Sequence, residues 1–256
     1  MTLTLSTYSV ILPLIFAAGF IDSIAGGGGL ISLPAYLVAG LPPHTALANN
    51  KFSSVFGTLL STIRYFKHGF IDIRVAFVSS IFALCGSYWG TKTVIKMTPF
   101  FLNYVLLILL PTITIFTLVK KEIGQQNFSH RLSWGNKIII ASLMGLIIGF
   151  YDGFFGPGTG TFLIFGFTLL LKYDFLTANG NTKVVNLASN IASVTTFLAQ
   201  GKVILLLGIP AAFAGIAGNY FGSRYVIQKG NKLIRIIYLS VFIMLLIKIL
   251  WDVIQN

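Results

Sequence analysis

Four stretches of this sequence are almost free of charged side chains, at residues 8–39, 75–90, 100–119 and 138–171. About 20 apolar residues are enough for a helix to cross the hydrocarbon core of a bilayer, so several crossings are expected. A membrane β-barrel would alternate apolar and polar residues over roughly ten-residue segments, and these runs do not. Only 9% of the residues are charged, which excludes an ordinary soluble domain. The sequence therefore predicts an all-α integral membrane protein.

The two halves of the chain repeat each other. Gly-Phe-Ile-Asp at 19–22 recurs as Gly-Phe-Tyr-Asp at 149–152, an offset of 130 residues. After a two-residue insertion the offset becomes 132, and it relates Asn49-x-Lys51 to Asn181-x-Lys183 and the segment Gly86–Gly90 to Gly218–Gly222. A register kept over this length indicates a duplication. We predict a first transmembrane repeat at 1–119, a cytoplasmic linker at 120–137 and a second repeat at 138–256.

Each half is predicted to hold about five helical segments, which makes eight to ten in the whole chain. In the first half they lie at about 8–25, 30–40, 45–67, 73–91 and 99–119, and the pattern restarts at 138. The second segment of each half is too short to cross comfortably, and we expect a broken or re-entrant hairpin with the first. Each half then crosses an odd number of times. The halves are predicted to be inverted relative to each other, as in many secondary transporters.

The basic residues agree with an inverted arrangement, because they lie in non-equivalent loops of the two halves. The predicted cytoplasmic set is Arg64, Lys67, Arg74, Lys120, Lys121, Arg131, Lys137, Arg224, Lys229, Lys232 and Arg235. The loops predicted on the other side hold only Lys92, Lys96 and Lys202. By the positive-inside rule, both termini are predicted to be non-cytoplasmic. The basic residues are scattered between apolar spans and form no continuous stripe, so we expect no binding of nucleic acid.

Two glycine-rich breaks, at 26–29 and 156–160, interrupt apolar sequence. Backbone groups freed there must be buried in protein or line a watery cavity. The segment after each break would present N–H groups and a positive dipole end, which together favour an anion. The predicted ligands at the breaks are Gly27, Gly28, Gly29, Gly158, Thr159 and Gly160. The alternative is close helix packing, which fits the four-residue glycine spacings Gly86/Gly90 and Gly218/Gly222 better.

Two lysines form the second constellation. They belong to the polar triplets Asn49-Asn50-Lys51 and Asn181-Thr182-Lys183. If Thr45 and Thr177 cap their helices, each lysine lies about 9 Å inside its helix, and the two approach one central region from opposite faces. A lysine at the bilayer centre costs about 2.5 to 3.5 kcal/mol and usually marks a pathway or has a partner. We predict that both triplets bind substrate; the alternative is that the lysines extend back to the interface.

Asp22 and Asp152 are the acidic residues inside the predicted spans, four residues before each break. They could carry protons, or they could be structural and pair with Lys51 or Lys183. His44, His68 and His130 show no ligand spacing with one another or with Cys85. We therefore expect no metal and no other cofactor.

At these residues the sequence resembles the sulfite exporter TauE/SafE family, and in particular its branch of bacterial inner-membrane proteins. The matching segments are Gly19–Gly29, Asn49–Lys51, Gly149–Gly160 and Asn181–Lys183, in order over both halves. Position 50 is Asn where the second half has Thr182. The resemblance implies a multi-pass protein of the inner membrane that exports sulfite, sulfoacetate or a similar small organic anion.

The sequence and the resemblance together predict a secondary transporter of a small, sulfur-containing anion, with alternating access to a site between the repeats. The expected partners are this anion, the lipid bilayer and, through the glycine pairs, another copy of the chain. A passive ion channel is one alternative, but the two acids and two lysines argue against a cation pore. An intramembrane enzyme has less support, because the sequence contains neither HExxH nor GxSxG. We predict no enzymatic activity.

Overall fold

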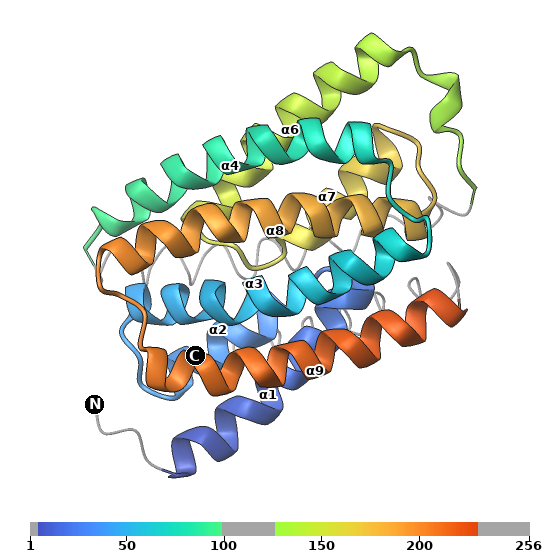
Figure 1. Cartoon of the computed structure of the whole chain (residues 1–256). Helices are drawn as coiled ribbons and strands as arrows, with labels where there is room; N and C mark the ends of the chain where they lie inside the picture. Colours follow the sequence, from blue (N-terminus) through green and yellow to red (C-terminus); the bar gives the residue numbers. More distant parts are fainter. Residues whose placement is uncertain (1–4, 99–125, 230–256) are drawn as a thin grey trace, which may run out of the picture.

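The computed structural model describes residues 5–98 and 126–229, and these residues form eight α-helices and one short 3-10 turn, without a strand (Figure 1). The helices are α1 (Leu5–Ala25), α2 (Gly29–Val38), α3 (Pro43–Lys67), α4 (Ile73–Ile95), α6 (Trp134–Phe154), α7 (Thr159–Leu169), α8 (Phe175–Ala199) and α9 (Leu205–Lys229); the turn is η1 (Ser129–Arg131). The all-α prediction is confirmed. The predicted segment 99–119, its counterpart from about 231 onward and linker residues 120–125 lie outside the described residues.

The most polar long helices lie in the middle of the bundle. Helices α3 and α8 pack against each other, α9 and α4 cover their outer sides, and α1 and α6 pack on α9 and α4 (Figure 1). Within residues 5–98 and 126–229, four helices are long and apolar enough to cross a membrane, namely α1 from Thr7 onward, α4, α6 and α9. Polar side chains are therefore enclosed while apolar helices form the outside, as expected for a protein surrounded by lipid.

The equivalent central helices α3 and α8 run in opposite directions. Asn181, in the second turn of α8, bonds to Asp72 just after the end of α3, and Asn49, in the second turn of α3, bonds to Ile204 just after the end of α8. Each central helix therefore begins where the other ends, so α3 and α8 are antiparallel (Figure 1). The outer helices also pack across the two halves. Helix α1 of the first half lies on α9 of the second, and α6 of the second half lies on α4 of the first.

The two glycine-rich breaks are present, as the sequence predicts. Helix α1 ends at Ala25 and α2 begins at Gly29, while α6 ends at Phe154 and α7 begins at Thr159. Helices α2 and α7 have 10 and 11 residues, so each reaches only about 15 Å, or half of the hydrocarbon core. Connections of four and five residues lead from α2 into α3 and from α7 into α8.

Three predicted helix starts are corrected. Helix α3 begins at Pro43, whose fixed φ suits a first helical position, with Pro42 as N-cap in place of Thr45. Helix α8 begins at Phe175 because Asp174, not Thr177, caps it; the Asp174 carboxylate accepts from the N–H of Thr177 at 3.1 Å. Helix α6 begins at Trp134 rather than at 138, because Ser133 caps it. Each lysine therefore lies about 12 Å inside its helix, deeper than predicted.

The glycine pairs lie at close helix contacts within the chain, as their spacing predicts. A side chain at Gly86 or Gly90 would meet the backbone of α6, and one at Gly218 or Gly222 would meet the backbone of α1. These surfaces are therefore occupied by the protein's own helices. The glycine pairs are therefore not available for packing against another copy of the chain, a role that the sequence had suggested.

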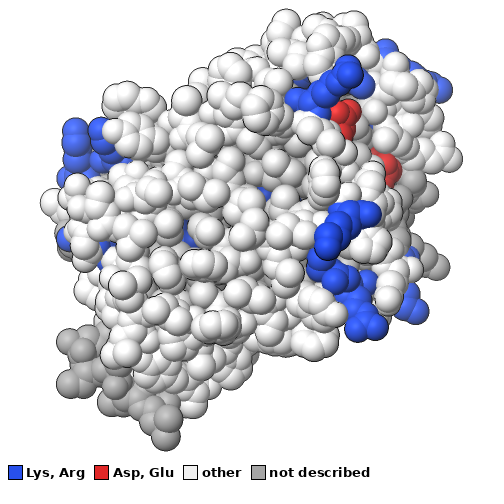
Figure 2. Space-filling view, viewed as in Figure 1, with Lys and Arg blue, Asp and Glu red and all other residues white. Residues whose placement is uncertain are grey.

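On the face that Figure 2 shows, most charged side chains gather at the two ends of the bundle, and the flank between them is almost entirely white. At one end Arg64 stacks on Tyr220 and Arg74 lies over Trp134. The basic residues at the ends of helices that meet there are Arg64, Lys67, Arg74, Arg131, Lys137, Lys172, Arg224 and Lys229. The opposite end holds Lys92, Lys96 and Lys202. The end with more basic residues is the one that the sequence predicts to be cytoplasmic.

Candidate anion site between the two halves

The two glycine-rich breaks touch each other in the middle of the protein. Gly26, with φ of 76°, lies so close to Gly160 and the N–H of Thr161 that a Cβ atom would collide with both. The Thr161 hydroxyl donates to the Ala25 carbonyl at 3.3 Å, which joins the break of one half to the break of the other. Only glycine fits both the left-handed backbone and this approach.

The first turns of the short helices use part of their own N–H groups. The N–H of Leu30 donates to the Gly27 carbonyl, and those of Ile31 and Ser32 donate to the Gly28 carbonyl. In the second half the Thr159 N–H donates to the Gly156 carbonyl. The helix ends therefore offer fewer free donors than the sequence suggests, and the positive charge at the breaks comes chiefly from the lysine side chains.

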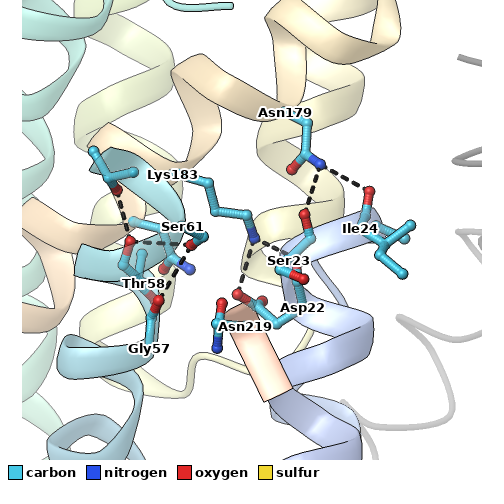
Figure 3. Close-up of polar contacts among 12 residues, drawn as sticks. Asp22, Ser23, Ile24, Gly57, Thr58, Ser61, Asn179, Lys183 and Asn219 are labelled. Carbon is cyan, nitrogen blue, oxygen red and sulfur yellow. Dashed lines mark hydrogen bonds and ion pairs between the residues drawn. The ribbon is translucent and has the colours of Figure 1, made fainter. Parts of the chain in front are cut away.

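Each lysine forms an ion pair with the aspartate of the opposite half. The Lys51 ammonium lies 2.7 Å from Asp152 Oδ1. The Lys183 ammonium lies 2.9 Å from Asp22 Oδ2, a pair that Figure 3 shows. Lys183 also donates to the main-chain carbonyl of Asp22. The four side chains are deeply buried, with Asp22 the most exposed at 16%. Because these four charges sum to zero, each buried charge has a compensating partner.

A cavity of about 40 Å³ lies beside the pairs, with room for about three water molecules. Of the predicted site residues, eight line it: Asp22, Gly28, Gly29, Asn50, Lys51, Asp152, Thr159 and Gly160. The other six, Gly27, Asn49, Gly158, Asn181, Thr182 and Lys183, do not. Lys51 is therefore the ammonium at the cavity wall, whereas Lys183 lies behind Asp22.

Asn49 and Asn181 instead bond to the opposite half at the two ends of the bundle. Asn181 Oδ1 accepts from the Asp72 N–H at 2.8 Å, and Asn49 Oδ1 accepts from the Ile204 N–H at 3.3 Å. In the repeat register Asp72 is equivalent to Ile204, so the two contacts are related by the duplication. Each fixes the start of α4 or α9 onto a central helix.

Seven further polar residues line the cavity that the sequence reasoning missed: Ser32, Ser53, Ser54, Thr58, Asn186, Asn190 and Asn219. The signal was available for four of them. Positions 54 and 58 lie three and seven residues after Lys51, on the same helix face, and the offset of 132 relates them to Asn186 and Asn190. Asn219 comes from α9 and could be found only in the tertiary structure.

The comparison with known proteins agrees with this architecture. The family model described as "Sulfite exporter TauE/SafE" matches residues 11–249. The chain belongs to this family. The resemblance seen in the sequence motifs is thereby confirmed, and the match spans both halves and all the ion-pair residues.

Several relatives in the TauE/SafE family match nearly the whole chain. A protein of a Sinorhizobium species named "Probable membrane transporter protein ORF9" is 35% identical over 93% of this chain and 90% of its own length. The "Probable membrane transporter protein YfcA" of Escherichia coli K12 is 34% identical over 92% of this chain and 86% of its own. No solved structure gives a significant match. This TauE/SafE protein is therefore a multi-pass membrane transporter.

Proposed function

We propose that the protein is a secondary transporter of a small sulfur-containing anion, sulfite or a sulfonate such as sulfoacetate, bound beside Lys51 between the two halves. The observation that carries this proposal is a buried ammonium at the wall of a polar cavity. Lys51 is 3% exposed, lines the cavity and is held by a single carboxylate oxygen at 2.7 Å. Hydroxyl and amide groups of Asn50, Thr159 and Asn186 surround the same space and can bond to anion oxygens.

Binding would be an exchange of partners at Lys51. An oxyanion that enters the cavity competes with Asp152 for the ammonium, and Asp152 keeps its bond from Ser189. The cavity holds about 40 Å³ of free space, which favours a compact anion. The printed name of the family refers to sulfite, which is a compact anion.

Alternating access to the site is supported by two equivalent contacts, one at each end of the bundle, in which each half binds the other. One end of the bundle is closed by Asn181 and Asp72, the other by Asn49 and Ile204. We propose that the two halves are inverted repeats in the membrane and that these ends open in turn while the site between them stays fixed. The end rich in basic residues would face the cytoplasm of a bacterial inner membrane.

The test uses the purified full chain in liposomes loaded with sulfite, and measures counterflow of labelled sulfite. The variant Lys51→Gln with Asp152→Asn removes the pair without leaving one buried charge, and we expect it to lose counterflow. The matched control, Lys202→Gln, changes an exposed lysine and should retain it. Counterflow that persists in the double variant would remove Lys51 from the site. Ion currents that exceed carrier turnover would identify a channel instead.

A further inference from the structure

The two ion pairs are equivalent by the repeat, yet their surroundings are not identical, and two of the differences concern the aspartates. Ser189 beside Asp152 corresponds to Gly57 beside Asp22, and Ser87 corresponds to Asn219. These two differences determine which hydrogen-bond donors lie next to each aspartate.

Asp152 has partners for both carboxylate oxygens. Its Oδ1 accepts from Lys51 at 2.7 Å, and its Oδ2 accepts from the Ser189 hydroxyl. Ser87 donates to the Ser189 carbonyl at 2.7 Å and so holds that part of α8 in place. With 2% exposure, Asp152 is an enclosed and fully bonded carboxylate.

Asp22 has a partner for only one carboxylate oxygen. Its Oδ2 pairs with Lys183 at 2.9 Å, and no group in residues 5–98 or 126–229 donates to Oδ1. Gly57 cannot supply the hydroxyl that Ser189 supplies in the other half. Asp22 is also 16% exposed and lines the cavity. One carboxylate oxygen therefore remains available to a ligand.

Asn219 adds a second available oxygen in the same cavity. Its Nδ2 donates to the Gly215 carbonyl at 3.0 Å, and Gly19 and Gly57 leave the space that this Nδ2 fills, since a Cβ at either would collide with it. The amide orientation is therefore fixed. Asn219 Oδ1 is buried and, in the described part of the chain, has no hydrogen-bond partner. Figure 3 shows the Asn219 side chain next to the Asp22 carboxylate.

The charge balance of the site gives these two oxygens a role. The charges of Lys51, Lys183, Asp22 and Asp152 sum to zero, so an entering anion leaves at least one uncompensated negative charge in a buried region. Such a charge is costly unless a positive charge accompanies it. Asp22 Oδ1 and Asn219 Oδ1 accept no hydrogen bond from the described residues, and both residues line the cavity. These two oxygens can therefore bind the accompanying positive charge. A buried polar atom without a partner is otherwise a cost.

We propose that Asp22 Oδ1 and Asn219 Oδ1 form a coupling site that binds one positive charge, a sodium ion or a proton, together with each transported anion. This inference rests on the proposed function and assigns the driving ion's place. It also separates the aspartates: Asp22 takes the coupling charge, while Asp152 holds Lys51. The other titratable groups around Asp22 are Lys183 on α8, Lys51 and Tyr65 on α3, and Asp152 on α6; α9 contributes the neutral Asn219.

The experiment measures initial sulfite uptake into liposomes that contain the full chain, with an inward sodium gradient, an inward proton gradient, or neither. For the wild type we expect one gradient to raise uptake about 10-fold. Two variants should abolish the increase, expressed as the ratio of uptake with a gradient to uptake without one in the same variant. Asn219→Leu removes one oxygen, and Gly57→Ser with Asn219→Ser copies the arrangement around Asp152. The control Asn136→Leu alters an exposed asparagine and should keep the increase.

The outcomes separate this site from the proposed function. Stimulation by sodium alone or by protons alone, lost in both variants, supports the site and names the ion. Full stimulation in Asn219→Leu and in the double variant would overturn it, as would wild-type uptake that neither gradient raises. A wild type without sulfite counterflow would contradict the proposed substrate. The coupling site has a separate test in the melting temperature. Sodium or a lowered pH should raise the melting temperature of the wild type and not that of Asn219→Leu, and an equal rise in both proteins would overturn the site.

Discussion

Asn181 Oδ1 accepts a hydrogen bond from the main-chain N–H of Asp72 at 2.8 Å and thereby joins the second turn of α8 to the residue that caps α4. The same side chain belongs to the Asn-x-Lys motif, but it lies at the end of the bundle and not at the cavity. Its loss would leave a half-buried N–H of the opposite half without an acceptor.

We therefore expect Asn181→Ala to lower the free energy of unfolding by about 1–3 kcal/mol. Thermal unfolding in detergent micelles measures the change. The exposed residue substituted in Asn136→Ala is the control and should leave the melting temperature unchanged. A melting temperature of Asn181→Ala equal to that of the wild type would show that the contact with Asp72 contributes nothing to stability.

Breaking the Lys51–Asp152 pair should be costly. Asp152→Ala leaves the Lys51 ammonium buried without a counter-charge, so we expect a loss of about 3–5 kcal/mol. The apolar pair Lys51→Met with Asp152→Leu should recover most of that loss, because no charge remains buried. Chemical unfolding in micelles compares the three proteins. If the double variant is less stable than the single one, the pair stabilises the fold beyond its charge compensation.

The helix contact at Gly86 should not tolerate a side chain. A Cβ there would collide with the backbone of α6 at Leu146 and Phe150, so Gly86→Leu should cost about 1–3 kcal/mol or more by forcing α4 and α6 apart. Gly135→Ala is the matched control, since nothing lies within 4 Å of its Cβ position. The yield of monodisperse protein and its melting temperature measure the effect. Equal values for both variants would contradict the close packing.

The pH dependence of stability should reveal the Tyr173–Asp72 contact in the loop before α8. Burial raises the pKa of Tyr173, and the hydrogen bond that its hydroxyl donates to Asp72 at 2.6 Å raises it further. A pKa raised above the unfolded value of about 10 gives stability that is complete below pH 10 and is lost as the pH rises through the folded pKa. The stability difference between wild type and Tyr173→Phe should therefore shrink above about pH 10. A constant difference from pH 8 to 11 would refute this contribution.

The orientation in the membrane can be tested with single cysteines. In a Cys85→Ala background, His68→Cys and Lys229→Cys place thiols at the end rich in basic residues, and Lys202→Cys places one at the opposite end. A membrane-impermeant maleimide added to intact cells should label only position 202. Labelling at 68 and 229, with protection at 202, would reverse the predicted orientation.

The sequence alone determined the helical class, the two breaks and the equivalence of the halves. These features are local: an apolar run of sufficient length, a cluster of glycines, and a register that is visible without any contact. The close packing at Gly86 and Gly218 could also be predicted, because a four-residue spacing places small residues on one helix face. The predicted starts of α3 and α8 were less accurate. Pro43 begins α3 and Asp174 caps α8, whereas the sequence analysis placed Thr45 and Thr177 in these roles.

Only the tertiary structure decided how the motif residues divide. Asn49 and Lys51 are two residues apart and so point about 200° apart around α3; which of them meets the cavity depends on how the helix is rotated against α8 and α9. The pairing of Lys51 with Asp152, and of Lys183 with Asp22, joins residues from opposite halves, and the sequence left both partners open. Asn219 reaches the site because Gly19 and Gly57 make room for it. Such contacts depend on the packing of whole helices, which no local pattern specifies.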